Sequence, residues 1–128
     1  MDCKILIVDD NEELLEALEM FLSPHFKVIE ILKRPDMALS RHQECNFDII
    51  LLDIRLPDMS GYDVLARLKH WRRYPKEVKG RSSQIPVLAM TAYAMESEGR
   101  KCLDAGASDV LVKPFYGYQL VEYIKRHI

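Results

Sequence analysis

The chain has 128 residues, of which 48% are hydrophobic and 30% charged, a composition that fits one soluble globular domain with a substantial core. Its 18 basic and 20 acidic residues give a net charge of −2, which offers no global electrostatic case for binding nucleic acid or a membrane surface. No apolar run reaches membrane-spanning length, and the first residues lack the order of a secretion signal, so we expect a cytoplasmic protein.

The cysteines and histidines show no metal-binding or disulfide pattern. Cys3, Cys45 and Cys102 are odd in number and widely separated, and the four histidines have no ligand spacing. We therefore interpret them as reduced thiols and as surface or boundary imidazoles.

Short apolar runs alternate with amphipathic segments along the chain. The runs predict strands at residues 5–8, 28–32, 49–52, 87–90 and 110–112. Glu30 interrupts the second run, which favours an edge position for that strand. Helices are predicted from Asp10 or Asn11 to Pro24, over 36–44, 61–71 and 96–104, and at the end of the chain.

Two of these helices have a clear apolar face. The first carries Leu14, Leu18, Phe21 and Leu22, and the last carries Leu120, Val121, Ile124 and Ile128. Five strand–helix units imply a parallel sheet with helices on both faces, because parallel neighbours need right-handed crossover connections. The expected fold class is α/β, a flavodoxin-like, doubly wound (βα)5 fold with a five-stranded sheet in the order 2-1-3-4-5.

Polar residues stand at the carboxyl ends of four of these strands. Asp9 and Asp10 follow the first strand and Asp53 follows the third, at the point where the strand order reverses and open sheets bind ligands. Thr91 and Lys113 end the fourth and fifth strands. Three crowded carboxylates repel one another, and Mg²⁺ would compensate them, since it binds one or two carboxylates and leaves room for a phosphate oxygen. A carboxylate nucleophile, a dication and two donors are what phosphoryl transfer requires.

At these residues the sequence resembles the receiver domain of two-component response regulators, especially chemotaxis-regulator-like receivers. "VDDNE" is similar to the family's acidic pair, and "DIRLPDMSG" matches its Asp-x-x-x-Pro-x-x-x-Gly phosphoacceptor segment. "MTA" matches the Thr-Ala pair, and "KPF" the lysine with its usually cis proline. The resemblance covers the whole chain, so residues 1–128 are expected to form one response regulator receiver domain. They end near the close of the last helix, which fits a stand-alone regulator or a receiver cut from a longer protein.

The resemblance implies a role for each site residue. Asp53 would accept a phosphoryl group from the phosphohistidine of a histidine kinase or histidine phosphotransfer domain. Mg²⁺ would be bound by Asp10 directly, by Asp9 mostly through water, and by Asp53 and the backbone carbonyl of Arg55. Thr91 and Lys113 would bind the phosphoryl oxygens and signal to the face of helix 4, strand 5 and helix 5.

The resemblance also implies what kind of activity to expect. Such a chain is not an enzyme in the usual sense, since it catalyses only its own phosphorylation and slow dephosphorylation. Its downstream partner, a separate protein or a linked effector domain, is unknown, and direct contact with nucleic acid or a membrane is not expected.

Three other classes of protein are alternatives to a receiver. A flavodoxin-like cofactor binder needs a hydroxyl- and glycine-rich phosphate loop after the first strand, where "DDNEE" would repel phosphate. A dehalogenase-type phosphohydrolase places an Asp-x-Asp motif there, which is absent. An unphosphorylated pseudo-receiver would not need the intact acidic pair, Asp53, Thr91 and Lys113.

The chain departs from the family pattern at three places. Val110 stands three residues before Lys113, where many receivers carry a Tyr or Phe that turns inward on activation. Arg55 and Tyr93 are bulky at positions that flank the path of attacking water, which predicts slow self-hydrolysis of the phosphoryl group. The basic segment 69–81, with interleaved aromatic residues, is either an extended helix followed by a solvated loop, which we favour, or a docking patch for an acidic partner.

Overall fold

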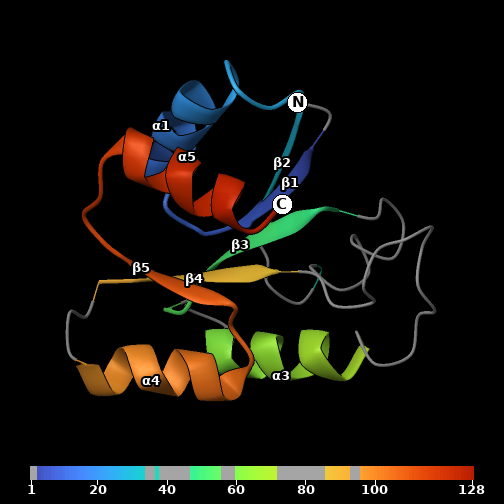
Figure 1. The fold of residues 1–128 in the computed structure, drawn as a ribbon, viewed down its shortest axis with the longest axis vertical. Coiled ribbons are helices and arrows are strands. Elements are labelled where there is room, and N and C mark those ends of the chain that lie inside the picture. Colours follow the sequence, from blue (N-terminus) through green and yellow to red (C-terminus); the bar gives the residue numbers. More distant parts are fainter. Residues whose placement is uncertain (1–2, 34–36, 38–46, 56–59, 72–85, 93–95) are drawn as a thin grey trace.

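The sheet has the predicted strand order. The computed structural model describes residues 3–33, 37, 47–55, 60–71, 86–92 and 96–128. All strands are parallel, in the order β2-β1-β3-β4-β5 (Figure 1). They are β1 (Lys4–Val8), β2 (Val28–Leu32), β3 (Ile49–Asp53), β4 (Val87–Thr91) and β5 (Asp109–Val112). The edge position of β2 confirms the prediction from Glu30.

The described helices form one layer on each face of the sheet. They are α1 (Glu12–Leu22), α3 (Gly61–Trp71), α4 (Glu96–Ala105) and α5 (Gly117–Arg126). In Figure 1, α1 and α5 cover one face, and α3 and α4 lie side by side on the other. The helix predicted over 36–44 falls almost wholly outside the described residues, as does the basic segment beyond residue 71. Within the described ranges, no helix is long and apolar enough to cross a membrane.

Alternate residues of each central strand face opposite helical layers. In β1, Ile5 and Ile7 pack in the core under α1 and α5, whereas Leu6 and Val8 pack in the core under α3 and α4. All four side chains are fully buried. This two-sided burial explains why the strands read as continuous apolar runs rather than alternating ones.

The buried stripe of α1 shares Leu18 and Leu22 with the predicted one but also contains Leu15, and Leu14 is only partly buried. Leu15, Leu18 and Leu22 are buried at helical spacing, whereas Phe21 lies at the edge of the stripe with half of its surface exposed. The Phe21 ring packs against Gly117 at the start of α5, where a Cβ would come within 2.4 Å of it. Ile128 was also predicted to be apolar helix surface, but it lies beyond the end of α5 and is exposed.

Local sequence signals explain where α1 begins and where α4 ends. The Asn11 side chain accepts a hydrogen bond from the Leu14 N–H at 3.2 Å, so Asn11, rather than Asp10, caps α1. Gly106 follows the last residue of α4 with φ 120°, a region that L side chains rarely adopt. The first cap leaves Asp10 available for another role.

Candidate functional site

The ends of β1 and β3 bring three carboxylates together. Val8 pairs in register with Leu52, so the residues that follow, Asp9 and Asp53, lie next to each other at the same edge of the sheet. One carboxylate oxygen from each of Asp9, Asp10 and Asp53 lies within 4.8 Å of the other two. Asp9 and Asp53 are buried, whereas Asp10 is exposed. The three acids predicted from the sequence therefore form one cluster.

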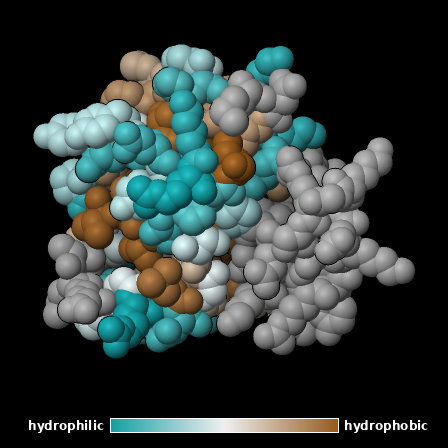
Figure 2. Space-filling view, viewed as in Figure 1, coloured by the Kyte–Doolittle hydropathy of each residue, from teal (hydrophilic) through white to brown (hydrophobic). Residues whose placement is uncertain are grey.

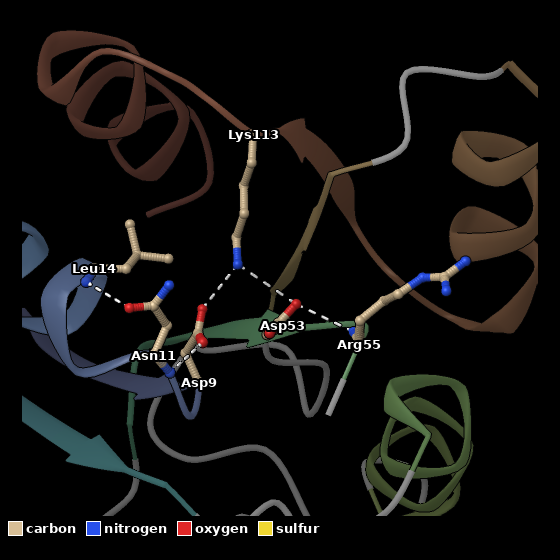
Figure 3. Close-up of polar contacts among 6 residues, drawn as sticks. All are labelled: Asp9, Asn11, Leu14, Asp53, Arg55 and Lys113. Carbon is tan, nitrogen blue, oxygen red and sulfur yellow. Dashed lines mark hydrogen bonds and ion pairs between the residues drawn. The ribbon is translucent and has the colours of Figure 1, made fainter. Parts of the chain in front are cut away.

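Lys113 reaches into this cluster from the end of β5 (Figure 3). Its Nζ donates a hydrogen bond to Asp9 Oδ2 at 3.0 Å and lies 3.5 Å from Asp53 Oδ1. The ammonium therefore balances part of the negative charge of the two buried carboxylates.

Backbone amides hold the two buried carboxylates in place. The Asn11 N–H donates to Asp9 Oδ1 at 3.0 Å, and the Arg55 N–H donates to Asp53 Oδ1 at 3.1 Å. The Arg55 side chain extends away from the carboxylates (Figure 3). The sequence predicts only a capping role for Asn11. An Asp side chain often accepts a hydrogen bond from the backbone N–H two residues later, and this local pattern would have predicted the bond between Asn11 and Asp9.

The electrostatics of the cluster raise the pKa of Asp53. Burial is the largest cause and the nearby charge of Asp9 is the second, and together they raise the pKa of this carboxyl from 3.8 to about 6. Lys113 and the Arg55 N–H act in the opposite direction. The raised pKa of Asp53 thus comes first from burial and second from the neighbouring carboxylate.

Thr91 ends β4 beside the cluster. Asp53 pairs in register with Met90, so Thr91 is one residue further along the neighbouring strand, and its side chain is fully buried. The Lys113 N–H donates to the Thr91 carbonyl at 2.7 Å, and the Lys113–Pro114 peptide is cis as the resemblance implied. Lys113 therefore lies beside Asp53 and Thr91 ends the neighbouring strand, while their roles toward a phosphoryl group stay predictions.

The donor atoms of the cluster suit a hard cation. Carboxylate oxygens from Asp9, Asp10 and Asp53 are the ligand type that Mg²⁺ and Ca²⁺ prefer, and the exposed Asp10 leaves the site open to solvent. These residues could hold a metal ion. Ligation by the Arg55 carbonyl stays a prediction, and Tyr93 lies outside the described residues.

Comparison with protein families identifies the family of this chain. A family model described as the response regulator receiver domain matches residues 5–125. The chain belongs to this family. The match omits a few residues at each end, so the extent of the receiver over 1–128 stays a prediction there.

Two relatives show how receivers occur in longer proteins. The signal transduction histidine-protein kinase BarA of Escherichia coli (strain K12) is 32% identical over 126 residues, which are 96% of this chain and 12% of that protein. The response regulator protein FleR of Pseudomonas aeruginosa is 32% identical over 99% of this chain and 25% of that protein. This receiver spans a small part of the length of either relative.

A solved receiver has a closely similar fold. The receiver domain of Ssk1 from Saccharomyces cerevisiae, solved with the histidine phosphotransfer protein Ypd1, aligns with a TM-score of 0.86 and 27% identity. The alignment covers 98% of this chain and 88% of the other. A Chloroflexus aurantiacus structure, described as a putative response regulator, has a TM-score of 0.83 and 28% identity over 98% of this chain and 97% of that one.

Proposed function

We propose that this receiver takes part in a two-component phosphorelay and that Asp53 is its phosphoacceptor. The observation that carries the proposal is the position of Lys113 Nζ, which bridges Asp9 and Asp53 at the end of β3. A carboxylate beside a fixed ammonium, at the open edge of a parallel sheet, suits transfer of a phosphoryl group.

In the proposed reaction, a carboxylate oxygen of Asp53 attacks phosphorus. The new O–P bond forms as the P–N bond of a phosphohistidine breaks, and the released imidazole nitrogen takes up a proton in place of the phosphoryl group. The Arg55 N–H orients the Asp53 carboxylate through Oδ1. Lys113 and Thr91 then stabilise the charge on the phosphoryl oxygens, which is the main contribution a protein makes to this reaction.

Asp9, Asp10 and Asp53 are proposed to hold Mg²⁺, with the Arg55 carbonyl as a further ligand. When bound, the ion neutralises the carboxylates and the incoming phosphoryl oxygens. The close approach of the three carboxylates supports this assignment, and the nearby charge of Asp9 is the second cause, after burial, of the raised pKa of Asp53, about 6.

The proposed phosphodonor is a histidine kinase or a histidine phosphotransfer domain. The similar receiver of Ssk1 was solved with such a phosphotransfer protein, and BarA is a histidine kinase by name. Transfer between soluble domains of this kind fits a cytoplasmic chain that acts as a phosphoacceptor rather than as an enzyme on other substrates. Its downstream partner is a separate protein or a linked effector domain.

Intact-protein mass measurement tests the assignment. Wild-type protein incubated with acetyl phosphate and Mg²⁺ is expected to gain one phosphoryl group, and Asp53→Asn is expected to gain none. Asp104→Asn, an exposed acid in α4, is the matched control and should be labelled like wild type. Equal labelling of Asp53→Asn, or labelling that persists when Mg²⁺ is chelated, would contradict the proposal.

A further inference from the structure

The start of α3 is fixed against the backbone of the phosphoacceptor strand. The Gly61 N–H donates to the Ile54 carbonyl at 3.0 Å. A Cβ at Gly61 would lie 2.5 Å from Ile54 Cα and 2.8 Å from the Asp53 carbonyl oxygen, so the two segments touch through backbone atoms. A displacement of the backbone at Asp53 is therefore transmitted directly to the first residue of α3.

The next residue, Tyr62, connects α3 to α4. Its hydroxyl donates a hydrogen bond to a Glu98 carboxylate oxygen at 2.6 Å, and Cys102 Sγ lies 4.0 Å from the same hydroxyl. The Lys101 ammonium lies 4.7 Å from the centroid of the Tyr62 ring. Three residues of α4 thus contact one side chain of α3, and the charged acceptor makes the hydroxyl bond stronger than a neutral one.

The described side chains of α4 that pack in or against the hydrophobic core are Cys102, which is fully buried, and Ala105, which is partly buried. Arg100, Lys101 and Leu103 are exposed. Figure 2 shows polar surface where α4 crosses the lower edge of the molecule. Gly99 weakens the helix further, because glycine is a poor helix former. Packing does not require glycine there, since no heavy atom lies within 4 Å of a Cβ added at that position.

We infer that the Tyr62 side chain holds α4 against α3 and couples the backbone at Asp53 to the position of α4. It does so through its hydrogen bond to Glu98 and through the Lys101 ammonium over its ring, and we call these two contacts the latch. The coupling part rests on the proposed phosphorylation of Asp53. The holding part concerns the unphosphorylated protein and stands independently.

Native-state hydrogen exchange of the unphosphorylated full chain tests the holding part. Tyr62→Phe removes the hydroxyl but keeps the ring under Lys101, and it is expected to speed amide exchange in α4 about tenfold, the effect of losing one hydrogen bond to a charged group. Exchange in α1 and β1 should not change. The matched control, Tyr118→Phe, removes the hydroxyl of an exposed tyrosine in α5 and should leave α4 as in wild type.

A second variant acts in the opposite direction without touching the latch. Gly99→Ala is expected to slow exchange in α4 about fivefold, because alanine stabilises a helix interior relative to glycine. The holding part is wrong if Tyr62→Phe leaves α4 within twofold of wild type, or speeds exchange equally in every element. It is also wrong if Gly99→Ala leaves α4 exchange unchanged, since α4 would then not open as a unit.

Beryllium fluoride with Mg²⁺, as an analogue of the phosphoryl group, tests the coupling part. It is expected to change α4 exchange several-fold in wild type and to change it much less in Tyr62→Phe, where the connection is already broken. An equal response in both proteins would overturn the coupling. A wild-type protein in which no amide near Asp53 responds would instead contradict the proposed function, while the exchange of the unphosphorylated variants would still decide the latch.

Discussion

At the scale of single residues, Asp53 is the position where stability and the proposed function oppose each other. Its carboxylate is buried beside Asp9, an arrangement that disfavours ionisation, and Lys113 and the Arg55 N–H offset that effect in part. A fold selected for stability alone would place an uncharged residue at the end of β3. The raised pKa of Asp53, caused first by burial and second by Asp9, therefore marks a residue whose charged form the folded protein disfavours.

This conflict predicts how stability depends on pH when the metal is chelated. The pKa of Asp53 is about 6 in the folded protein and 3.8 ordinarily, so the folded state binds the proton more tightly. Stability should then fall as pH rises from about 4 to about 6. Above that range the free energy of unfolding of Asp53→Asn should exceed that of wild type by up to about 3 kcal/mol, and near pH 3.5 the two values should be equal. Urea denaturation in EDTA measures this, and a difference independent of pH would contradict it.

Asp10 makes a different prediction, because it is exposed and Asn11 already caps α1. Asp10→Ala should weaken Mg²⁺ binding roughly tenfold or more by removing a carboxylate ligand, with little loss of stability. A fluorescence or calorimetric titration with MgCl₂ measures the affinity, and Glu13→Ala, in the first turn of α1, is the control. Unchanged Mg²⁺ affinity of Asp10→Ala would remove it from the ligand set.

At the scale of elements, two glycines in helices behave oppositely. Gly61 begins α3 so close to β3 that a Cβ would meet backbone atoms at 2.5 to 2.9 Å, whereas Gly99 in α4 has open space around it. Gly61→Ala should cost about 2 to 4 kcal/mol of folding free energy, because backbone must shift. Gly99→Ala should gain up to about 1 kcal/mol. Chemical denaturation measures the free energy of unfolding of both variants. Changes of the same sign in the two would contradict the close approach of Gly61 to β3.

The elements themselves were largely predictable from the sequence. Strands buried on both faces appear as short apolar runs, and the acidic, Asn and Gly signals mark helix ends, so most bounds agree within one or two residues. Leu15 and Phe21 show where the pattern fails: Leu15, which was not predicted, is buried, whereas Phe21 is half exposed with its ring against Gly117 of α5. Which apolar side chains of α1 are buried depends on how the helix packs against the sheet and α5, and the spacing within one helix does not contain that information. The Tyr62–Glu98 hydrogen bond was also not predictable from the sequence, since it joins two residues 36 positions apart on different helices.

At the scale of the whole molecule, the topology of the sheet made the site predictable. In a parallel sheet every strand ends at the same edge, so Asp9, Asp53, Thr91 and Lys113 are brought together by topology alone. The pairing of Lys113 with Asp9 was not predictable, because the lysine chain reaches several partners at that edge.

The spread of a phosphorylation signal through the molecule is also expected to be unusual. Val110, at the position where many receivers carry an aromatic switch, is partly buried against the core under α3 and α4 and pairs in register with Ala89. A β-branched side chain is stiff and too small to exchange a ring between two positions. Beryllium fluoride should therefore shift backbone amide resonances over residues 91–96 and in α4, and shift residues 110–112 little. Large shifts through β5 into Tyr118 and Tyr123, with residues 91–96 unaffected, would contradict this.

The central claim is that Asp53 carries the phosphoryl group, and chemical trapping in the wild-type protein tests it most directly. Protein phosphorylated with acetyl phosphate and Mg²⁺ is reduced with borohydride, which converts an aspartyl phosphate to homoserine, and the modified residue is located by peptide mass spectrometry. The account predicts reduction at Asp53 and none at Asp9 or Asp10. Reduction at either of those two residues, with Asp53 intact, would contradict it.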